Sequence, residues 1–165
     1  WAGLEGTSII AAEKEEKLLE TLPRELVDVA KGFKEYLSVI PESKIAMEVG
    51  VSAMHDVTEG GVFGALWELG EASGVGITAH LDKIPIKQET IEVCEVFKIN
   101  PYMLISSGSM MIGCEKGNLL VEKLEEAGIN AAVIGRATEG NDRIVVSRDE
   151  TRYIGPAGSD ELYKI

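Results

Sequence analysis

The chain has 165 residues, 45% of them hydrophobic and 27% charged, as is usual for one soluble globular domain. The formal net charge of −12 argues against duplex nucleic acid or an anionic membrane surface as a partner. No apolar run approaches the roughly 20 residues of a membrane span, and no signal peptide is recognisable, so we expect a cytoplasmic protein. The chain opens at Trp1 rather than Met, as a domain taken from a longer protein would.

Helices are expected in the first third of the chain. Thr7 or Ser8 can cap a helix that runs to about Glu20. Pro23 opens a second helix, which Pro41 stops. A short third helix is expected over residues 43–49, before Gly50.

Strands and helices then mix along the rest of the chain. Apolar spacing predicts a helix from Val62 that Gly74 ends, and helices over residues 88–98 and 119–127. Strands are expected over residues 51–54, 76–81, 110–114, 129–134 and 143–147. The order predicts a single α+β domain, residues 1–165, in which helices pack on one face of a mixed β-sheet.

The two cysteines, Cys94 and Cys114, sit in apolar contexts and form no CxxC pair. We expect two buried, reduced thiols. His80 has no Cys or carboxylate partner at metal-ligand spacing, so no metal site is predicted.

The most unusual segment joins the strand at residues 51–54 to the helix at Val62. Glycines Gly60 and Gly61 at a helix start leave backbone N–H groups open to an anion, and Thr58 could cap the helix or bond a phosphate oxygen. Asp56 could hold a metal ion that carries phosphate or orient a substrate hydroxyl, and His55 could carry a proton. The alternative is an ordinary capped helix start with a permissive turn.

Two further sets of polar residues are candidates for the same site. Glu68 lies two helical turns beyond Gly61, where a lone glutamate is otherwise a solvated side chain. Ser106, Ser107 and Gly108 either line a pocket or form a turn before the next strand.

Several segments resemble one known family. The stretch MHDVTEGGVFGALWELGEASGVG is similar to the glycine-rich signature of the AIR-synthase-like (PurM-like) C-terminal domain. The stretches IPIKQETIEVCEVFKINPYMLISSGSMMIG, AGINAAVIGRAT and GLEGTSIIA resemble further parts of that domain in the right order. Within the superfamily the chain looks most similar to the hydrogenase expression/formation E-type proteins and their relatives.

The resemblance implies a two-domain, dimeric enzyme that uses ATP and Mg²⁺, held mostly by an N-terminal domain that this chain lacks. The isolated domain is then expected to bind no cofactor and to be inactive. Its partners would be its own N-terminal domain, a second copy, and a maturation protein. Carried over to this sequence, the family's site implicates Asp56 and His55 as catalytic, with Thr58, Gly60, Gly61, Glu68, Ser106, Ser107 and Gly108 binding phosphate or substrate.

The chain also departs from the resemblance. E-type maturation proteins end in a mobile tail with a terminal cysteine, whereas this chain ends in Leu162-Tyr163-Lys164-Ile165. Glu59, beside the glycines, is unfavourable for an anion. A non-catalytic module for dimerisation or partner docking is therefore the rival hypothesis.

Overall fold

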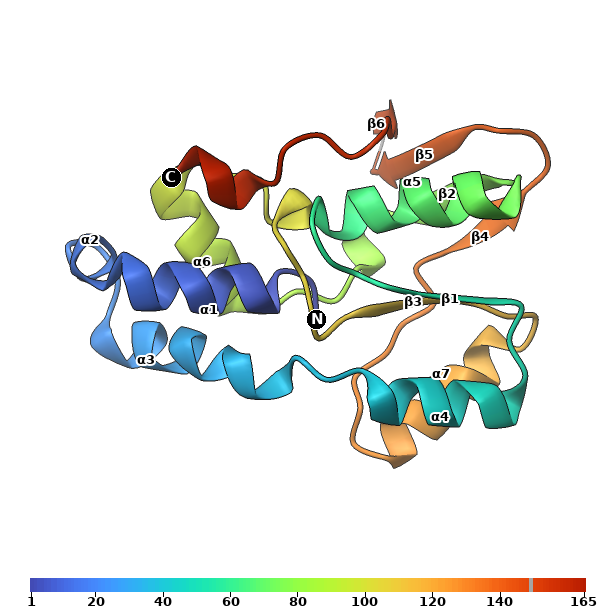
Figure 1. Cartoon of the computed structure of the whole chain (residues 1–165), viewed down its shortest axis with the longest axis horizontal. Helices are drawn as coiled ribbons and strands as arrows, with labels where there is room; N and C mark the ends of the chain where they lie inside the picture. The colour runs from blue at the N-terminus through green and yellow to red at the C-terminus, as the bar shows by residue number, and fades with distance from the viewer. Residues whose placement is uncertain (149) are drawn as a thin grey trace.

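The computed structural model describes residues 1–148 and 150–165. Its helices and strands mix along the chain in an α+β arrangement, which confirms the predicted class (Figure 1). The α-helices are α1 (Leu4–Glu13), α2 (Glu15–Leu19), α3 (Arg24–Gly32), α4 (Ile40–Val49), α5 (Gly61–Ser73), α6 (Gln88–Phe97) and α7 (Gly117–Glu126). The strands are β1 (Ala53–Asp56), β2 (Gly76–His80), β3 (Met110–Gly113), β4 (Gly135–Thr138), β5 (Arg143–Ser147) and β6 (Glu150–Tyr153). Short 3₁₀ turns lie at Phe33–Tyr36, Leu81–Lys83, Pro101–Met103 and Glu161–Lys164.

The strands form two separate sheets. A mixed four-stranded sheet has the order β4-β2-β5-β6, in which β2 runs parallel to β5 and antiparallel to β4. Strands β1 and β3 pair antiparallel in a two-stranded ribbon, with His55 opposite Met111 and Asp56 opposite Met110. The ribbon carries the chain directly into the candidate site at the start of α5.

Three apolar clusters hold these elements together. The first lies between α5 and the four-stranded sheet and includes Val62, Leu66, Ile77 and Val145. The second lies among α1, α3 and α6, in the left half of Figure 1, and includes Ile10, Leu18, Val27, Val93 and Leu104. The third is smaller and joins α4 to α7 through Ala46, Leu120 and Leu124. Leu104 lies just before the turn of Ser106, Ser107 and Gly108, which we call the serine turn. Leu104 thus belongs to the core and fixes the position of that turn.

Several helix ends confirm the sequence analysis. Helix α5 ends at Gly74, which adopts a left-handed φ of 63°. Gly50 follows α4 with φ 91°, and Gly128 lies just beyond α7 with φ 76°. A left-handed residue lets the chain leave a helix, and glycine adopts that conformation without a Cβ clash.

The prediction that Thr7 or Ser8 caps the first helix is wrong. Helix α1 begins at Leu4, and both residues are buried inside it. The Thr7 hydroxyl donates to the Thr90 hydroxyl at 3.1 Å, which ties α1 to α6. The helical segment also breaks at Lys14, so that α1 and α2 replace one helix to Glu20.

Pro41 does not stop a helix, as the sequence had suggested; it lies in the first turn of α4. Proline is tolerated there because first-turn N–H groups have no partner within the helix. The preceding helix already ends at Gly32 and continues as a 3₁₀ turn. Ile40, the first residue of α4, is 61% exposed.

The strand predictions need three corrections. The first strand is shifted to Ala53–Asp56 and alternates between half-buried and exposed residues, because it belongs to a two-stranded ribbon rather than a covered sheet. Residues 129–134 form no strand, and β4 follows them. Strand β6 was missed because all four of its residues are exposed and show no alternation.

Candidate functional site

The glycine turn between β1 and α5 has a left-handed backbone at two successive residues. Gly60 has φ 77° and Gly61 has φ 61°. A Cβ at Gly61 would lie 2.7 Å from the carbonyl oxygens of both Tyr102 and Leu104. The close approach that requires glycine at position 61 is therefore made by the protein's own backbone, whereas the sequence analysis had ascribed it to a phosphate.

The backbone N–H groups of the glycine turn are both used within the chain. Gly60 N donates to the Asp160 carboxylate at 2.7 Å, and Gly61 N donates to the Thr58 carbonyl at 3.1 Å. Gly60 is the N-cap residue of α5, and no side chain caps this helix. The suggestion that the Thr58 side chain is the cap is therefore wrong. Thr58 is exposed, which leaves its hydroxyl accessible to a ligand.

Three of the candidate polar side chains meet between β1 and α5, two helical turns beyond Gly61. His55 Nε2 lies 3.0 Å from a Glu68 carboxylate oxygen, and Nδ1 lies 2.5 Å from the Asp56 carbonyl oxygen. Both partners are acceptors, so both contacts are hydrogen bonds only when the imidazole carries two protons. The Glu68 side chain is 44% exposed and that of Asp56 is 66% exposed, so these carboxylates remain open to solvent. The structure thus brings together His55, Asp56 and Glu68.

The serine turn lies against the glycine turn but is bound up in the fold. Ser106 is fully buried; its hydroxyl accepts from Gly3 N and donates to the Leu104 carbonyl, each at 2.7 Å. Its own N–H donates to the Thr58 carbonyl at 3.4 Å. The Ser106 hydroxyl is therefore committed to internal partners in this conformation.

The next two residues of the serine turn brace neighbouring elements. Ser107 N donates to the Glu5 carboxylate at 3.3 Å. Gly108 has φ 92°, and a Cβ there would overlap the Tyr36 carbonyl oxygen. The turn therefore connects the 3₁₀ segment after α3 with α1.

Asp160 is a central residue of this region that the sequence analysis missed. The residue is 3% exposed, and its carboxylate accepts from the N–H groups of Gly60 (2.7 Å), Ile105 (3.2 Å) and Leu162 (2.9 Å). The contact with Leu162 caps the last 3₁₀ turn, and an aspartate two residues before an apolar residue is a recognisable capping signal. Nothing local indicates the bonds to Gly60 and Ile105, which join segments far apart in sequence.

A second contact links the end of the chain to the glycine turn. The Tyr163 hydroxyl donates to a Glu59 carboxylate oxygen at 2.8 Å. This hydrogen bond and the negative charge of Glu59 raise the pKa of the Tyr163 phenol. Glu59, which the sequence analysis had marked as unfavourable for an anion, thus binds a side chain of the same protein.

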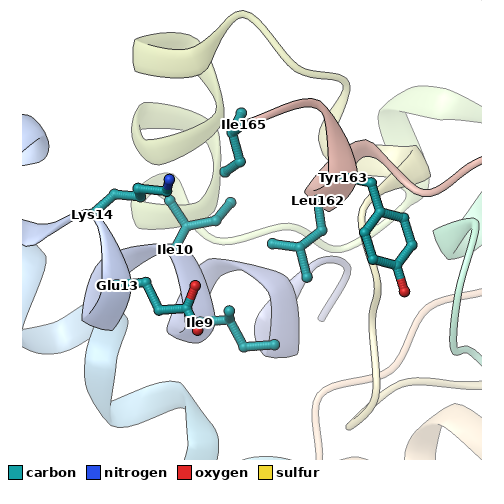
Figure 2. Close-up of a pocket in the computed structure, with 7 residues that line it drawn as sticks. All are labelled: Ile9, Ile10, Glu13, Lys14, Leu162, Tyr163 and Ile165. Atoms are coloured by element: carbon teal, nitrogen blue, oxygen red, sulfur yellow. The ribbon is translucent and has the colours of Figure 1, made fainter.

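A surface groove of about 470 Å³ lies between α1 and the C-terminal turn (Figure 2). Ile9, Ile10 and Glu13 of α1 and Lys14 just after it form one wall, and the opposite wall consists of Leu162, Tyr163 and Ile165. No residue of the predicted site lines this groove, and Tyr163 is the link between the groove and Glu59.

The two cysteines differ in environment. Cys94 is 1% exposed, as expected, and burial together with the nearby Glu161 charge raises its pKa to about 12. Cys114 is only partly buried, and both thiols are free. Within residues 1–148 and 150–165, no three His, Cys, Asp or Glu side chains gather as a metal site would require. No helix in that part of the chain has the length and apolar character for crossing a membrane.

Comparisons with known proteins place these features in a family. Residues 2–147 match the family described as AIR synthase related protein, C-terminal domain. A putative hydrogenase expression/formation protein of Methanocaldococcus jannaschii is 33% identical in a 153-residue alignment that covers 86% of this chain and 45% of that protein. The carbamoyl dehydratase HypE of Rhodobacter capsulatus is 28% identical in a 97-residue alignment that covers 56% of this chain and 28% of that protein.

Solved structures share the fold. E. coli HypE superposes with a TM-score of 0.79 at 24% identity, over 99% of this chain and 49% of that one. HypE in complex with ATP (19% identity) and a HypE–HypF complex (23% identity) each match at 0.64 over 72% of this chain and 40% and 41% of theirs. T. maritima PurL complexed with ATP matches at 0.51 and 20% identity, over 69% of this chain and 19% of that one.

This chain spans about half the length of the M. jannaschii protein and of E. coli HypE. The family match covers most of its residues and includes the glycine turn, the His55 cluster and the serine turn. The chain therefore belongs to the AIR synthase related protein family and represents its C-terminal domain.

Proposed function

We propose that this domain is the substrate- and phosphate-side half of an ATP-dependent AIR-synthase-like enzyme related to hydrogenase maturation. Family membership supports the ATP-dependent chemistry, since HypE and PurL have both been crystallised with ATP. The observation that carries the site is the cluster of His55, Asp56 and Glu68 between β1 and α5. ATP and Mg²⁺ would be held mostly by the other half of the protein, and the full-length protein would be a dimer.

Thr58 and the side chains of this cluster have distinct roles in the proposal. The Thr58 hydroxyl bonds a phosphate or substrate oxygen at the exposed edge of the glycine turn. His55, held by Glu68 at 3.0 Å, carries a proton to or from the reacting group. Asp56, the most exposed of the three, orients the substrate.

The test uses the full-length protein and compares variants whose side chains are not part of the core. Thr58→Val, Asp56→Asn and Glu68→Gln should each lower ATP turnover by about tenfold or more while leaving the melting temperature unchanged. The matched control is Glu126→Gln, which removes an exposed carboxylate on α7, far from the glycine turn in sequence. Turnover equal to that of Glu126→Gln in all three variants would contradict the proposed site.

A second candidate function, a module for partner docking, is favoured by the apolar side chains on α4 and the turn before it. Tyr36 is 64% exposed, Ile40 61% and Met47 69%. The HypE–HypF complex shows that a protein of this fold assembles with a maturation partner. ATP turnover that is lost in the site variants favours the enzyme. Turnover that needs none of them, with partner binding that Met47→Lys abolishes, favours the docking module.

A further inference from the structure

The Asp160 carboxylate joins three segments of the chain around the glycine turn. One of its oxygens accepts from Gly60 N at 2.7 Å, and the other accepts from Ile105 N at 3.2 Å and Leu162 N at 2.9 Å. Figure 1 shows the C-terminal segment passing the start of α5 before its last turn. Because hydrogen bonds to a charged group are stronger than those between neutral groups, this buried carboxylate fixes the three segments relative to one another.

Two of these segments also hold the backbone of Thr58. The Thr58 carbonyl oxygen accepts from Gly61 N at 3.1 Å and from Ser106 N at 3.4 Å. Each of these donors directly follows a residue whose N–H group the Asp160 carboxylate binds. Along both segments, the carboxylate therefore lies one residue away from the N–H group that fixes the exposed Thr58.

The glycine turn is also packed against two other parts of the chain. A Cβ at Gly60 would lie 2.9 Å from the Ala157 Cβ, and a Cβ at Gly64 would lie 3.3 Å from it. A Cβ at Gly61 would instead meet the backbone of residues 102–104. The C-terminal segment is thus an integral part of the surroundings of the turn, and Asp160 is the residue that bonds it there.

We propose that Asp160 is a positioning residue, which holds Thr58 where its hydroxyl meets a phosphate or substrate oxygen. This inference rests on the proposed function, which gives Thr58 that role. Asp160 is buried and both of its carboxylate oxygens accept from N–H groups of the chain, so it acts through the glycine turn and the serine turn. It lies beyond residues 2–147, which match the family, so the C-terminal segment adds this contact to the matched domain.

The experiment is a double-mutant cycle on ATP turnover by the full-length protein. Asp160→Asn leaves one acceptor oxygen where the carboxylate has two, so at least one segment loses its acceptor. This variant should lower kcat/KM for ATP by about tenfold, because a small displacement of a positioned group slows the reaction. In the Thr58→Val background, Asp160→Asn should leave kcat/KM unchanged, because the group that Asp160 positions is already absent.

Two further variants separate positioning from stability. Gly74→Ala, at the far end of α5, should lower stability but keep wild-type turnover below its melting temperature. An equal loss of turnover in Gly74→Ala and Asp160→Asn would show that instability lowers turnover, and would overturn the proposal. Asp160→Ser can still cap the last 3₁₀ turn through Leu162 N but is too short to bind Gly60 and Ile105 as well. It should match Asp160→Asn in turnover, and it replaces that variant in the cycle if Asp160→Asn does not fold.

The outcomes distinguish the positioning role from the proposed function. Wild-type turnover in Asp160→Asn, with turnover lost in Thr58→Val, would overturn the positioning role and leave the function standing. A loss from Asp160→Asn that is as large in the Thr58→Val background as in the wild type would also overturn it, because Asp160 would then act on another group. Wild-type turnover in Thr58→Val would overturn the role of Thr58 in the proposed function, and the role of Asp160 with it.

Discussion

Gly61→Ala is the substitution for which the structure gives the strongest expectation. The residue has φ 61°, and a left-handed backbone costs a residue with a Cβ about 1–2 kcal/mol. The new methyl would also lie 2.7 Å from two carbonyl oxygens and 2.9 Å from Leu104 N, all of them backbone atoms. Because a backbone cannot rotate away as a side chain can, we expect a further cost of about 1–3 kcal/mol.

Gly74→Ala separates these two contributions. Gly74 follows the other end of the same helix, has φ 63°, and has no atom within 4 Å of its would-be Cβ. This control carries the left-handed cost alone, so its free energy of unfolding should fall by about 1–2 kcal/mol. Gly61→Ala should therefore be less stable than Gly74→Ala by about 1–3 kcal/mol.

Urea denaturation followed by far-ultraviolet circular dichroism measures both variants against the wild type. Equal destabilisation of the two would show that the segment 102–104 yields easily to a side chain at position 61. The close approach of that backbone would then not explain why position 61 is a glycine, and the approach of a ligand would again be the better explanation.

Three further predictions concern the serine turn, the cysteines and Tyr163. Ser106→Ala leaves the buried Gly3 N–H without its acceptor and should lower the free energy of unfolding by about 1–3 kcal/mol. Ser107 makes its contact through the backbone, so Ser107→Ala should have little effect in the same urea denaturation assay. Ellman's reagent should titrate Cys114 in the folded chain and Cys94 only after unfolding. Since the pKa of Cys94 is about 12 when folded against 9.0 for an ordinary thiol, stability should fall as pH rises from about 9 to 12, and less so in Cys94→Ala. Because the pKa of the Tyr163 phenol is raised, Tyr163 stabilises the folded state below pH 10, and this stabilisation is lost as the pH rises through the pKa of the folded state. Tyr163→Phe should remove the highest of the exposed phenol titrations seen by absorbance at 295 nm.

The sequence predicts elements well where an apolar stripe and a terminating glycine agree. Helix α5 shows this, because Val62, Ala65 and Leu66 are buried and Gly74 terminates the helix. Prediction fails where the same residue type is found both at the start and at the end of helices. Pro41 is as compatible with a helix start as with a stop, and only the packing of α4 on α7 decides between them.

In the candidate site, too, contacts between sequence neighbours could be predicted, whereas contacts between distant residues could not. The closeness of His55 to Asp56 follows from their adjacency, but the contact with Glu68 depends on how the ribbon enters α5. The burial of Ser106 and the role of Asp160 could not be predicted, because their partners lie 103 and 100 residues away in sequence. Hydroxyl and carboxylate groups suit a ligand site and an internal hydrogen-bond network equally well, and local sequence does not distinguish the two.

Whether a residue is bound into the fold or exposed determines whether its substitution can identify the functional site. Gly61 and Ser106 are bound into the fold through backbone contact and buried hydrogen bonds, so a loss of activity on their replacement would follow from instability alone. Thr58 and Asp56 are exposed, so their replacement removes chemistry without removing a core contact. A loss of turnover at unchanged stability in these two positions is therefore the evidence that distinguishes a reaction site from a well-built helix start.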